Sequence, residues 1–171
     1  MDMFEVGDNV VYGSNGVCRV AKVGTLDSLG VAKDKIYYTL SPYFIPGSTI
    51  FTPADNKKVI IRPVLSKQEA MQLIDEIKEI ETLWIADEKS RENEYKEAFR
   101  KCDCRELVKI IKTIHLRQEA RIAEGKKETT LDEKYFHMAE ERLYEELTIP
   151  LEMTVDEVRE FVIARVEEQL G

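Results

Sequence analysis

The spacing of hydrophobic residues changes once along this chain, close to Pro63. Before it, apolar and polar residues alternate in short runs such as residues 17–23, which is the two-residue period of a strand. From Ser66 onward, apolar residues recur at steps of three and four, the period of a helix with one buried face. No Gly/Ser-rich or Pro-rich linker lies at the change. The chain is therefore predicted to fold as two consecutive domains, 1–65 and 66–171, with limited relative mobility.

The first domain is predicted to consist of strands. Five runs rich in β-branched and aromatic residues are expected to form them: residues 6–12, 17–23, 35–40, 48–52 and 59–63. Between the first two runs, Gly13-Ser14-Asn15-Gly16 is a turn signal, because an Asn-Gly pair adopts positive φ at little cost. Five short strands without a helical period predict a small antiparallel β-barrel or a strongly bent sheet.

The second domain is predicted to be all-helical. Capping boxes, in which Ser, Thr or Asp precedes an acidic residue by three positions, predict helix starts at Ser66, Asp103, Thr130 and Thr154. A fifth helix is expected over residues 87–100, and the helix from Asp103 is expected to end near Gly125. The residues expected on buried helix faces include Ile77, Ile80, Tyr95, Ile110, Leu116, Met138, Leu143 and Val158. The predicted fold class is thus α+β, a β-barrel followed by a bundle of about five helices.

Charge is distributed unevenly along the chain. The net charge is −8, yet residues 83–127 hold 12 basic and 9 acidic residues, whereas residues 128–171 hold 4 basic and 13 acidic residues. The basic stretch has two interpretations, a solvated face of amphipathic helices or a surface for an anionic partner. Residues 1–65 are close to neutral, with 7 basic and 6 acidic residues, so a protein partner is expected for the first domain.

The sequence contains none of the motifs that mark common catalytic sites. There is no Gly-rich phosphate loop, no G-x-S-x-G elbow and no H-E-x-x-H helix. Two histidines and three cysteines do not supply a zinc ligand set, and free thiols are expected. The acidic pairs Glu140-Glu141 and Glu145-Glu146 are expected on the solvated side of their helix. We therefore expect a protein that is not an enzyme and that has no metal, cofactor or small-molecule substrate.

The start of the chain lacks the basic and then apolar order of a secretory signal. No apolar run approaches the roughly 18 residues that span a bilayer. A cytoplasmic protein without a membrane partner is expected.

The first domain contains the motifs Val6-Gly7-Asp8-x-Val10-Val11-Tyr12, Gly16-Val17-x-x-Val20 and Tyr37-Tyr38-x-Leu40. These motifs, together with several in the second domain, resemble the bacterial CarD/CdnL family of transcription regulators. The first domain also resembles the polymerase-interacting domain of transcription-repair coupling factors. In the second domain the motifs are Trp84 ahead of Arg91-Glu92-Asn93, Asp103 at the next helix start, and Ala139-Glu140-x-x-Leu143-x-x-Glu146-Leu147. The resemblance covers nearly the whole chain.

The resemblance implies a Tudor-like or SH3-like domain that docks on the RNA polymerase β subunit by pairing an edge strand. The polymerase-binding residues would be Ser48, Thr49, Ile50, Phe51 and Thr52. It implies also that the helical domain contacts promoter DNA, independently of sequence, at the upstream edge of the bubble, with a tryptophan at the minor groove. The DNA-binding residues would be Trp84, Lys89, Arg91, Arg100, Lys101, Lys109 and Lys112. The expected function is a shift in the stability of the open promoter complex.

Two alternatives stay open on the sequence alone. Trp84 could instead end the first helix and pack into the bundle together with Ile80, Leu83 and Ile85. The whole protein could be an adaptor, with the β domain on one protein partner, the acidic final helices on another, and no DNA contact.

Overall fold

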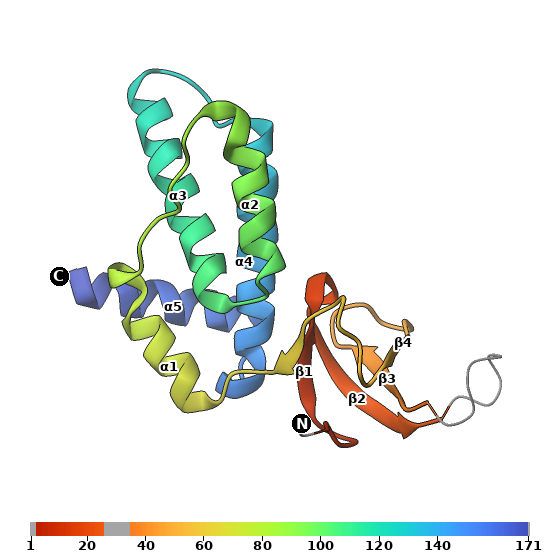
Figure 1. Cartoon of the computed structure of the whole chain (residues 1–171). Coiled ribbons are helices and arrows are strands. Elements are labelled where there is room, and N and C mark those ends of the chain that lie inside the picture. Colours follow the sequence, from red (N-terminus) through yellow and green to blue (C-terminus); the bar gives the residue numbers. More distant parts are fainter. Residues whose placement is uncertain (1–2, 26–34, 171) are drawn as a thin grey trace. The chain divides into compact units, whose positions relative to one another are not determined.

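All the strands precede all the α-helices along the described chain (Figure 1). The computed structural model describes residues 3–25 and 35–170. The chain divides into two compact units, Met1–Val64 and Leu65–Gly171, called here the β unit and the helical unit. The predicted α+β class, with strands first and helices second, is confirmed.

The β unit is one antiparallel sheet with the strand order β4-β3-β2-β1-β5. Each strand overlaps one of the five predicted runs, so the prediction of five strands is confirmed. The strands are β1 (Asn9–Tyr12), β2 (Val17–Gly24), β3 (Tyr37–Pro42), β4 (Ile50–Pro53) and β5 (Ile61–Pro63). In the described residues, ladder pairing leaves β4 and β5 as the two edges.

The sheet is strongly curled. Strands β1 and β4 are separated by two others in the sheet, yet the Tyr12 hydroxyl donates to Thr52 Oγ1 at 3.0 Å. The register of β2 shifts between Val20 and Lys22, and such a bulge bends a strand and increases its twist. The side chains enclosed by the curl form a separate core of Val10, Tyr12, Cys18, Val20, Tyr38 and Leu40. Of the two predicted forms, the structure has the strongly bent sheet.

The turn between β1 and β2 needs its first glycine. Gly13 has a φ of +47°, and a Cβ built there would lie 2.6 Å from Val59 Cγ1. The next positive φ in this turn belongs to Gly16 and not to Asn15. The predicted turn is therefore present, with both glycines supplying the left-handed backbone.

The helical unit contains five α-helices and two short 3-10 turns within its described residues. The helices are α1 (Lys67–Asp75), α2 (Arg91–Arg100), α3 (Cys104–Ala123), α4 (Thr130–Leu151) and α5 (Val155–Leu170). The 3-10 turns are η3 (Ile77–Glu79) and η4 (Glu88–Ser90). The capping boxes predicted at Ser66 and Thr154 are both formed. α3 ends as predicted, with Gly125 at a φ of +76° and hydrogen bonds from Gly125 N to Ile122 O and from Lys126 N to Arg121 O.

Several helix boundaries differ from the prediction. α1 ends at Asp75, so Ile77 and Ile80 reach the core from η3 and the residue after it. α4 begins one residue early because the Thr129 hydroxyl, and not that of Thr130, accepts from the Asp132 amide. At Asp103 the carboxylate caps Arg105 N, but Glu106 does not complete the box because its carboxylate binds Lys109.

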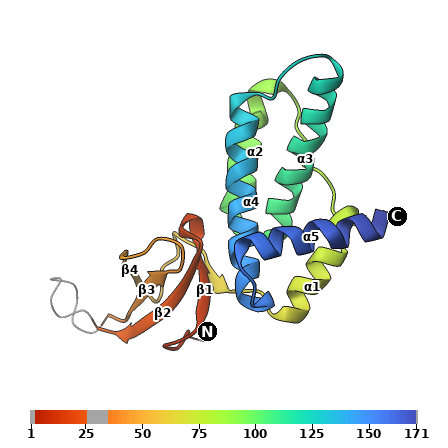
Figure 2. The ribbon, with the colours of Figure 1, turned by 180° about the vertical axis from the view of Figure 1, so that it is seen from behind.

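Three sets of side chains lie on a different face from the one predicted. Leu116 is 55% exposed, because two residues beyond Ile114 is about 200° around a helix. Met138 is 37% exposed beside the buried Ala139. The pair Glu145-Glu146, predicted to be solvated, is buried. This pair is buried because α4 is contacted by α1, α2, α3 and α5, which leave this part of the helix little surface for solvent (Figure 2).

Burial of these carboxylates requires partners or protonation. Glu146 accepts from the Leu65 amide and the Cys104 thiol, both at 3.1 Å. Burial, together with the neighbouring charge of Glu141, raises the pKa of Glu145. The three cysteines are thiols, as predicted.

Ile110, fully buried in α3, provides a test of the helix faces. Ile110→Ala is expected to lower the free energy of unfolding by about 2 to 5 kcal/mol, because it removes buried carbon and leaves a cavity. The matched control is Ile122→Ala in the same helix, where the side chain is 70% exposed. That control should change stability by no more than about 0.5 kcal/mol. Urea unfolding followed by circular dichroism measures both, and equal losses would mean that α3 buries a different face.

Candidate functional site

Trp84 is the most exposed large hydrophobic residue among those described, with 80% of its surface accessible. It lies in residues 80–87, which connect η3 to η4 without forming a helix or strand. Its neighbours Leu83 and Ile85 are partly buried and pack against the core of the helical unit. The interpretation of Trp84 as a core residue at the end of the first helix is therefore wrong. We call residues 80–87 the Trp84 segment.

An ion-pair network lies directly after the Trp84 segment and joins three helices. Asp132 of α4 is 1% exposed and accepts from the Tyr95 hydroxyl at 2.8 Å and from Arg117 Nε at 2.9 Å. Arg91 Nε lies 3.2 Å from the same carboxylate, an ion-pair contact without hydrogen-bond geometry. Glu88 of η4 pairs with both arginines at the edge of the network.

The pKa values in this network follow from its charges. Burial alone would raise the pKa of Asp132, but the hydrogen bonds from Arg117 and Tyr95 and the two positive charges outweigh burial, so the pKa is lowered. Burial and the bond to Asp132 raise the pKa of Tyr95. For Arg117, the contacts with Asp132 and Glu88 outweigh burial and raise the pKa. At neutral pH the Asp132 carboxylate and the Arg117 guanidinium are therefore charged, and the Tyr95 hydroxyl keeps its proton.

The basic residues predicted to bind DNA fall into two groups. Lys89, Arg100 and Lys101 are exposed, although Arg100 pairs with Glu97 at 2.6 Å and Lys101 lies 3.6 Å from Glu106. Arg91, Lys109 and Lys112 are at least partly buried and are used inside the unit. Arg91 is 7% exposed in the Asp132 network, Lys109 pairs with Glu106 at 3.2 Å, and Lys112 donates to backbone carbonyls.

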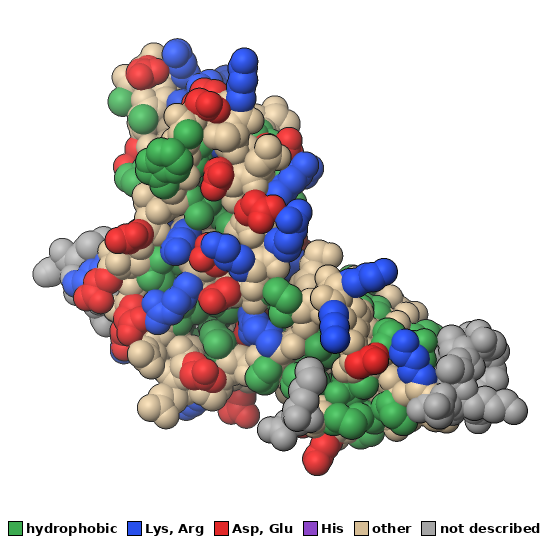
Figure 3. Space-filling view, in the orientation of Figure 1, with side chains coloured by type: hydrophobic (Ala, Val, Ile, Leu, Met, Phe, Trp, Pro, Cys, Tyr) green, Lys and Arg blue, Asp and Glu red, His purple; other side chains and the backbone are tan. Residues whose placement is uncertain are grey.

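Lys96 is an exposed cation that the sequence analysis missed. It lies one turn before Arg100 on α2 and is exposed like Lys89 and Asn93. The spacing of Asn93, Lys96 and Arg100 by three and four residues places them on one face of the helix, and this signal was available in the sequence. Over the rest of the helical unit, basic and acidic side chains are interspersed in the view of Figure 3.

The five residues predicted to bind polymerase lie on and just before an edge strand. β4 pairs with β3 on one side, and in the described residues its other side pairs with no strand. Phe51 is 47% exposed. Thr52 is 1% exposed, and its hydroxyl oxygen accepts hydrogen bonds from the side chains of Tyr12 and Asn56. Ser48 and Thr49 precede the strand, and Ile50 is its first residue and is half-buried.

An apolar cluster on the connection from β3 to β4 was not predicted. Tyr43 and Phe44 are 41% exposed and Ile45 is 47% exposed. They are followed by Pro46 and Gly47, which favour a turn, and this composition alone does not distinguish an exposed apolar turn from a buried one.

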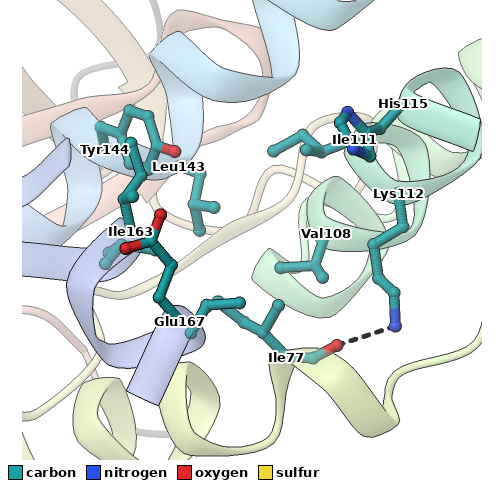
Figure 4. Close-up of a pocket in the computed structure, with 11 residues that line it drawn as sticks. Ile77, Val108, Ile111, Lys112, His115, Leu143, Tyr144, Ile163 and Glu167 are labelled. Carbon is teal, nitrogen blue, oxygen red and sulfur yellow. Dashed lines mark hydrogen bonds between the residues drawn. The ribbon is translucent and has the colours of Figure 1, made fainter. Parts of the chain in front are cut away.

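A cavity of about 380 Å³ opens between η3, α3, α4 and α5. Its lining is mostly aliphatic, including Ile77, Val108, Ile111 and Val162, with Lys112 at one side (Figure 4). The Lys112 ammonium is not free to bind a ligand in the cavity, since it donates to the carbonyl of Ile77 at 2.9 Å.

Within the described residues, no group of three potential metal ligands is found. No helix in the described part of the chain is long and apolar enough to cross a bilayer.

Residues 4–65 match the family model described as CarD-like/TRCF RID domain. The β unit is a CarD-like/TRCF RID domain. It therefore belongs to a type of domain that interacts with RNA polymerase, and the resemblance seen in the sequence is confirmed for this part of the chain. A search of curated proteins found no match.

The Asp132 network should control the acid stability of the helical unit. Because the folded pKa of Asp132 is lowered, its stabilising contribution is fully present above the unfolded value of about 3.9 and is lost as pH falls through the lower folded value. Asp132→Asn removes the buried counter-charge of Arg91, which is 7% exposed, and of the partly buried Arg117, and should cost about 3 to 5 kcal/mol at pH 7.

Urea unfolding at pH 7 and at several values below pH 4 measures this effect. The difference between Asp132→Asn and the wild type should shrink as the pH falls, since the wild-type carboxylate becomes protonated. The matched control is Asp156→Asn, in which the same substitution removes a carboxylate that is 89% exposed. A cost below about 1 kcal/mol for Asp132→Asn would contradict the assignment.

Proposed function

We propose that this protein is a non-enzymatic bacterial transcription regulator that joins RNA polymerase to promoter DNA. In this proposal β4 of the RID domain docks on the polymerase β subunit, and the Trp84 segment contacts DNA near the upstream edge of the bubble. The observation that supports it most directly is an indole held 80% exposed next to inward-facing Leu83 and Ile85. Tryptophan is among the residue types that most often anchor binding interfaces.

Edge pairing suits the exposed side of β4. A short edge strand presents unpaired N–H and C=O groups that another strand can bond, and exposed side chains of alternate residues supply specificity. Phe51 is exposed on this strand, while Thr52 is occupied inside the sheet. Docking would therefore depend on backbone bonds and on Phe51, in a domain whose overall charge is close to neutral.

An exposed indole suits contact with distorted DNA. Apolar side chains in the minor groove insert at base steps that are already unstacked, and nearby cations that contact phosphates fix their position without reading sequence. Lys89, Lys96 and Arg100 are the first exposed cations that follow Trp84 in the sequence. A factor tethered to polymerase acts at high local concentration, so even a weak DNA contact can matter.

The effect on transcription would follow from linkage. Contacts that are better in the open promoter complex than in the closed complex shift the balance toward the open form by the difference in affinity and no more. No catalytic step is needed, and the site would act in the cytoplasm, where polymerase and promoter are found.

A second candidate is an adaptor that binds two proteins. It is favoured by the internal use of Arg91, Lys109 and Lys112, which reduces the positive charge available to phosphates. In this case Trp84 would anchor a protein partner, since exposed tryptophans are frequent hot spots of protein interfaces.

Phe51→Asp is expected to weaken binding to the isolated β subunit by about 30-fold or more, the effect of losing a hot spot of about 2 kcal/mol. Desolvating a new carboxylate at the edge adds to the loss of the ring. The matched control is Ile60→Asp, because Ile60 is a 45% exposed residue next to the opposite edge strand, β5. Surface-immobilised β subunit allows both affinities to be measured. Wild-type affinity of Phe51→Asp would exclude this edge.

Trp84→Ala should leave the fold and polymerase binding intact while shortening the half-life of the open complex. The stability change is expected to stay within about 0.5 kcal/mol because the side chain is exposed. Thermal unfolding and competitor-challenged promoter complexes, prepared from the same sample, measure the two quantities.

Controls separate DNA contact from the adaptor function. Lys96→Glu changes an exposed cation and should lower the slope of log affinity against log salt by roughly one. Charge reversal at Arg91 or Lys112 cannot serve here, since it breaks contacts inside the unit. An unchanged open-complex half-life in both Trp84→Ala and Lys96→Glu would favour the adaptor.

A further inference from the structure

The Trp84 segment has no helix or strand of its own to hold it. A side chain on a loosely held segment must lose conformational freedom whenever it binds, and this loss reduces affinity. Yet Leu83 and Ile85 are both in contact with the core, so the segment has a defined conformation. The groups that fix it come mainly from α3, which the segment crosses in Figure 1.

Lys112 of α3 holds the beginning of the segment. Its ammonium group donates to the carbonyls of Ile77 at 2.9 Å and Lys78 at 3.1 Å, and also to that of Ile80. These carbonyls belong to η3 and to the residue that follows it, and the Ile77 carbonyl also accepts from the Ile80 amide at 3.2 Å. A cation placed there satisfies three acceptors at once. Burial lowers the pKa of this ammonium.

Thr113 holds the middle of the segment. Its hydroxyl accepts from the Leu83 amide at 2.9 Å and donates to the Lys109 carbonyl at 2.7 Å. A hydroxyl group can do both at the same time. Thr113 is 7% exposed, so water does not readily replace either bond. Leu83 directly precedes Trp84, so a fixed Leu83 amide restricts the backbone that carries the indole.

The far end of the segment is held by the same helix. Asp87 Oδ1 accepts from Ser90 N at 2.9 Å and begins η4, and Glu88 of η4 pairs with Arg117 of α3 at 3.2 Å. Lys112 thus contacts the first residue of the segment, Thr113 its middle and Arg117 the residue directly after it, from about one and a half turns of α3.

We infer that Lys112 and Thr113 are positioning residues that hold the Trp84 segment against α3 and thereby keep the indole directed outward. The inference extends the proposed function, since the indole is the group assigned to DNA there. It assigns Lys112 a different role from phosphate binding, because three carbonyls already occupy its ammonium. Neither residue needs to touch a partner.

Amide hydrogen exchange tests the positioning directly. Thr113→Val keeps the branched shape and removes the hydroxyl, whereas Thr113→Ser keeps the hydroxyl. Exchange protection of the Leu83 amide should fall about tenfold in Thr113→Val and be retained in Thr113→Ser. Protection that is equal in wild type and Thr113→Val would overturn the inference.

Relaxation measurements extend the test to Lys112. In Lys112→Met the backbone order parameters of residues 80–86 should fall from about 0.85 toward about 0.6, whereas the matched control Lys96→Met, at an exposed position, should leave them unchanged. Because Trp84 is the only tryptophan, time-resolved fluorescence anisotropy reports the same loosening at the indole. Far-UV circular dichroism shows whether Lys112→Met folds. If it does not, the exchange of the Leu83 amide in Thr113→Val decides whether the inference holds.

Open-complex half-lives then distinguish this inference from the proposed function. Thr113→Val should shorten the half-life in the same direction as Trp84→Ala, with unchanged polymerase affinity, and Thr113→Ser should not. If Trp84→Ala shortens it and Thr113→Val does not, the positioning role is overturned while the proposed function stands. If Trp84→Ala has no effect, the proposed function fails, and the exchange and relaxation results alone decide whether α3 positions the indole.

Discussion

A single buried carboxylate holds together three helices of the helical unit. Asp132 of α4 binds Tyr95 of α2 and Arg117 of α3 and lies beside Arg91 at the start of α2. A buried charge is costly unless each of its partners is in place, so this contact disfavours any packing in which α2 shifts along α4. Because Arg91 directly follows η4, the network also fixes where the Trp84 segment must end. The position of the exposed indole therefore depends on an interaction that the indole itself does not make.

The same network withdraws part of the basic stretch of sequence from the surface. Several cations of residues 83–127 make contacts within the helical unit. Arg91 and Arg117 form ion pairs with Asp132, and Lys112 donates hydrogen bonds to backbone carbonyls. Their stems and charges stabilise the packing of helices, and only part of the positive charge remains available to solvent. Lys96 and Arg100, on the outer face of α2, are among the cations that remain exposed. Local charge sums along a sequence are thus a poor guide to surface potential in a helical bundle.

Local patterns predicted the architecture well. Alternation gave all five strands, and the capping residues Ser66 and Thr154 predicted their helix starts correctly, because both signals depend on neighbours in the sequence. Predictions that depended on distant partners were less successful. The burial of Glu146 follows from the central position of α4, and no residue near Glu146 in the sequence indicates that it will bind Leu65 and Cys104. The exposure of Trp84 could not be derived from the hydrophobic pattern, because α1 ends at Asp75, five residues before that pattern does.

The shortness of β4 limits what can be added to the sheet. The strand has four residues and ends at Pro53, which has no amide hydrogen to donate. Long, flat edges recruit further copies of themselves and lead to aggregation, and natural proteins prevent this with short edges and prolines. An incoming strand would find only a few backbone groups before the pairing stops. The edge can therefore accept one partner strand without offering a template on which a fibril could grow.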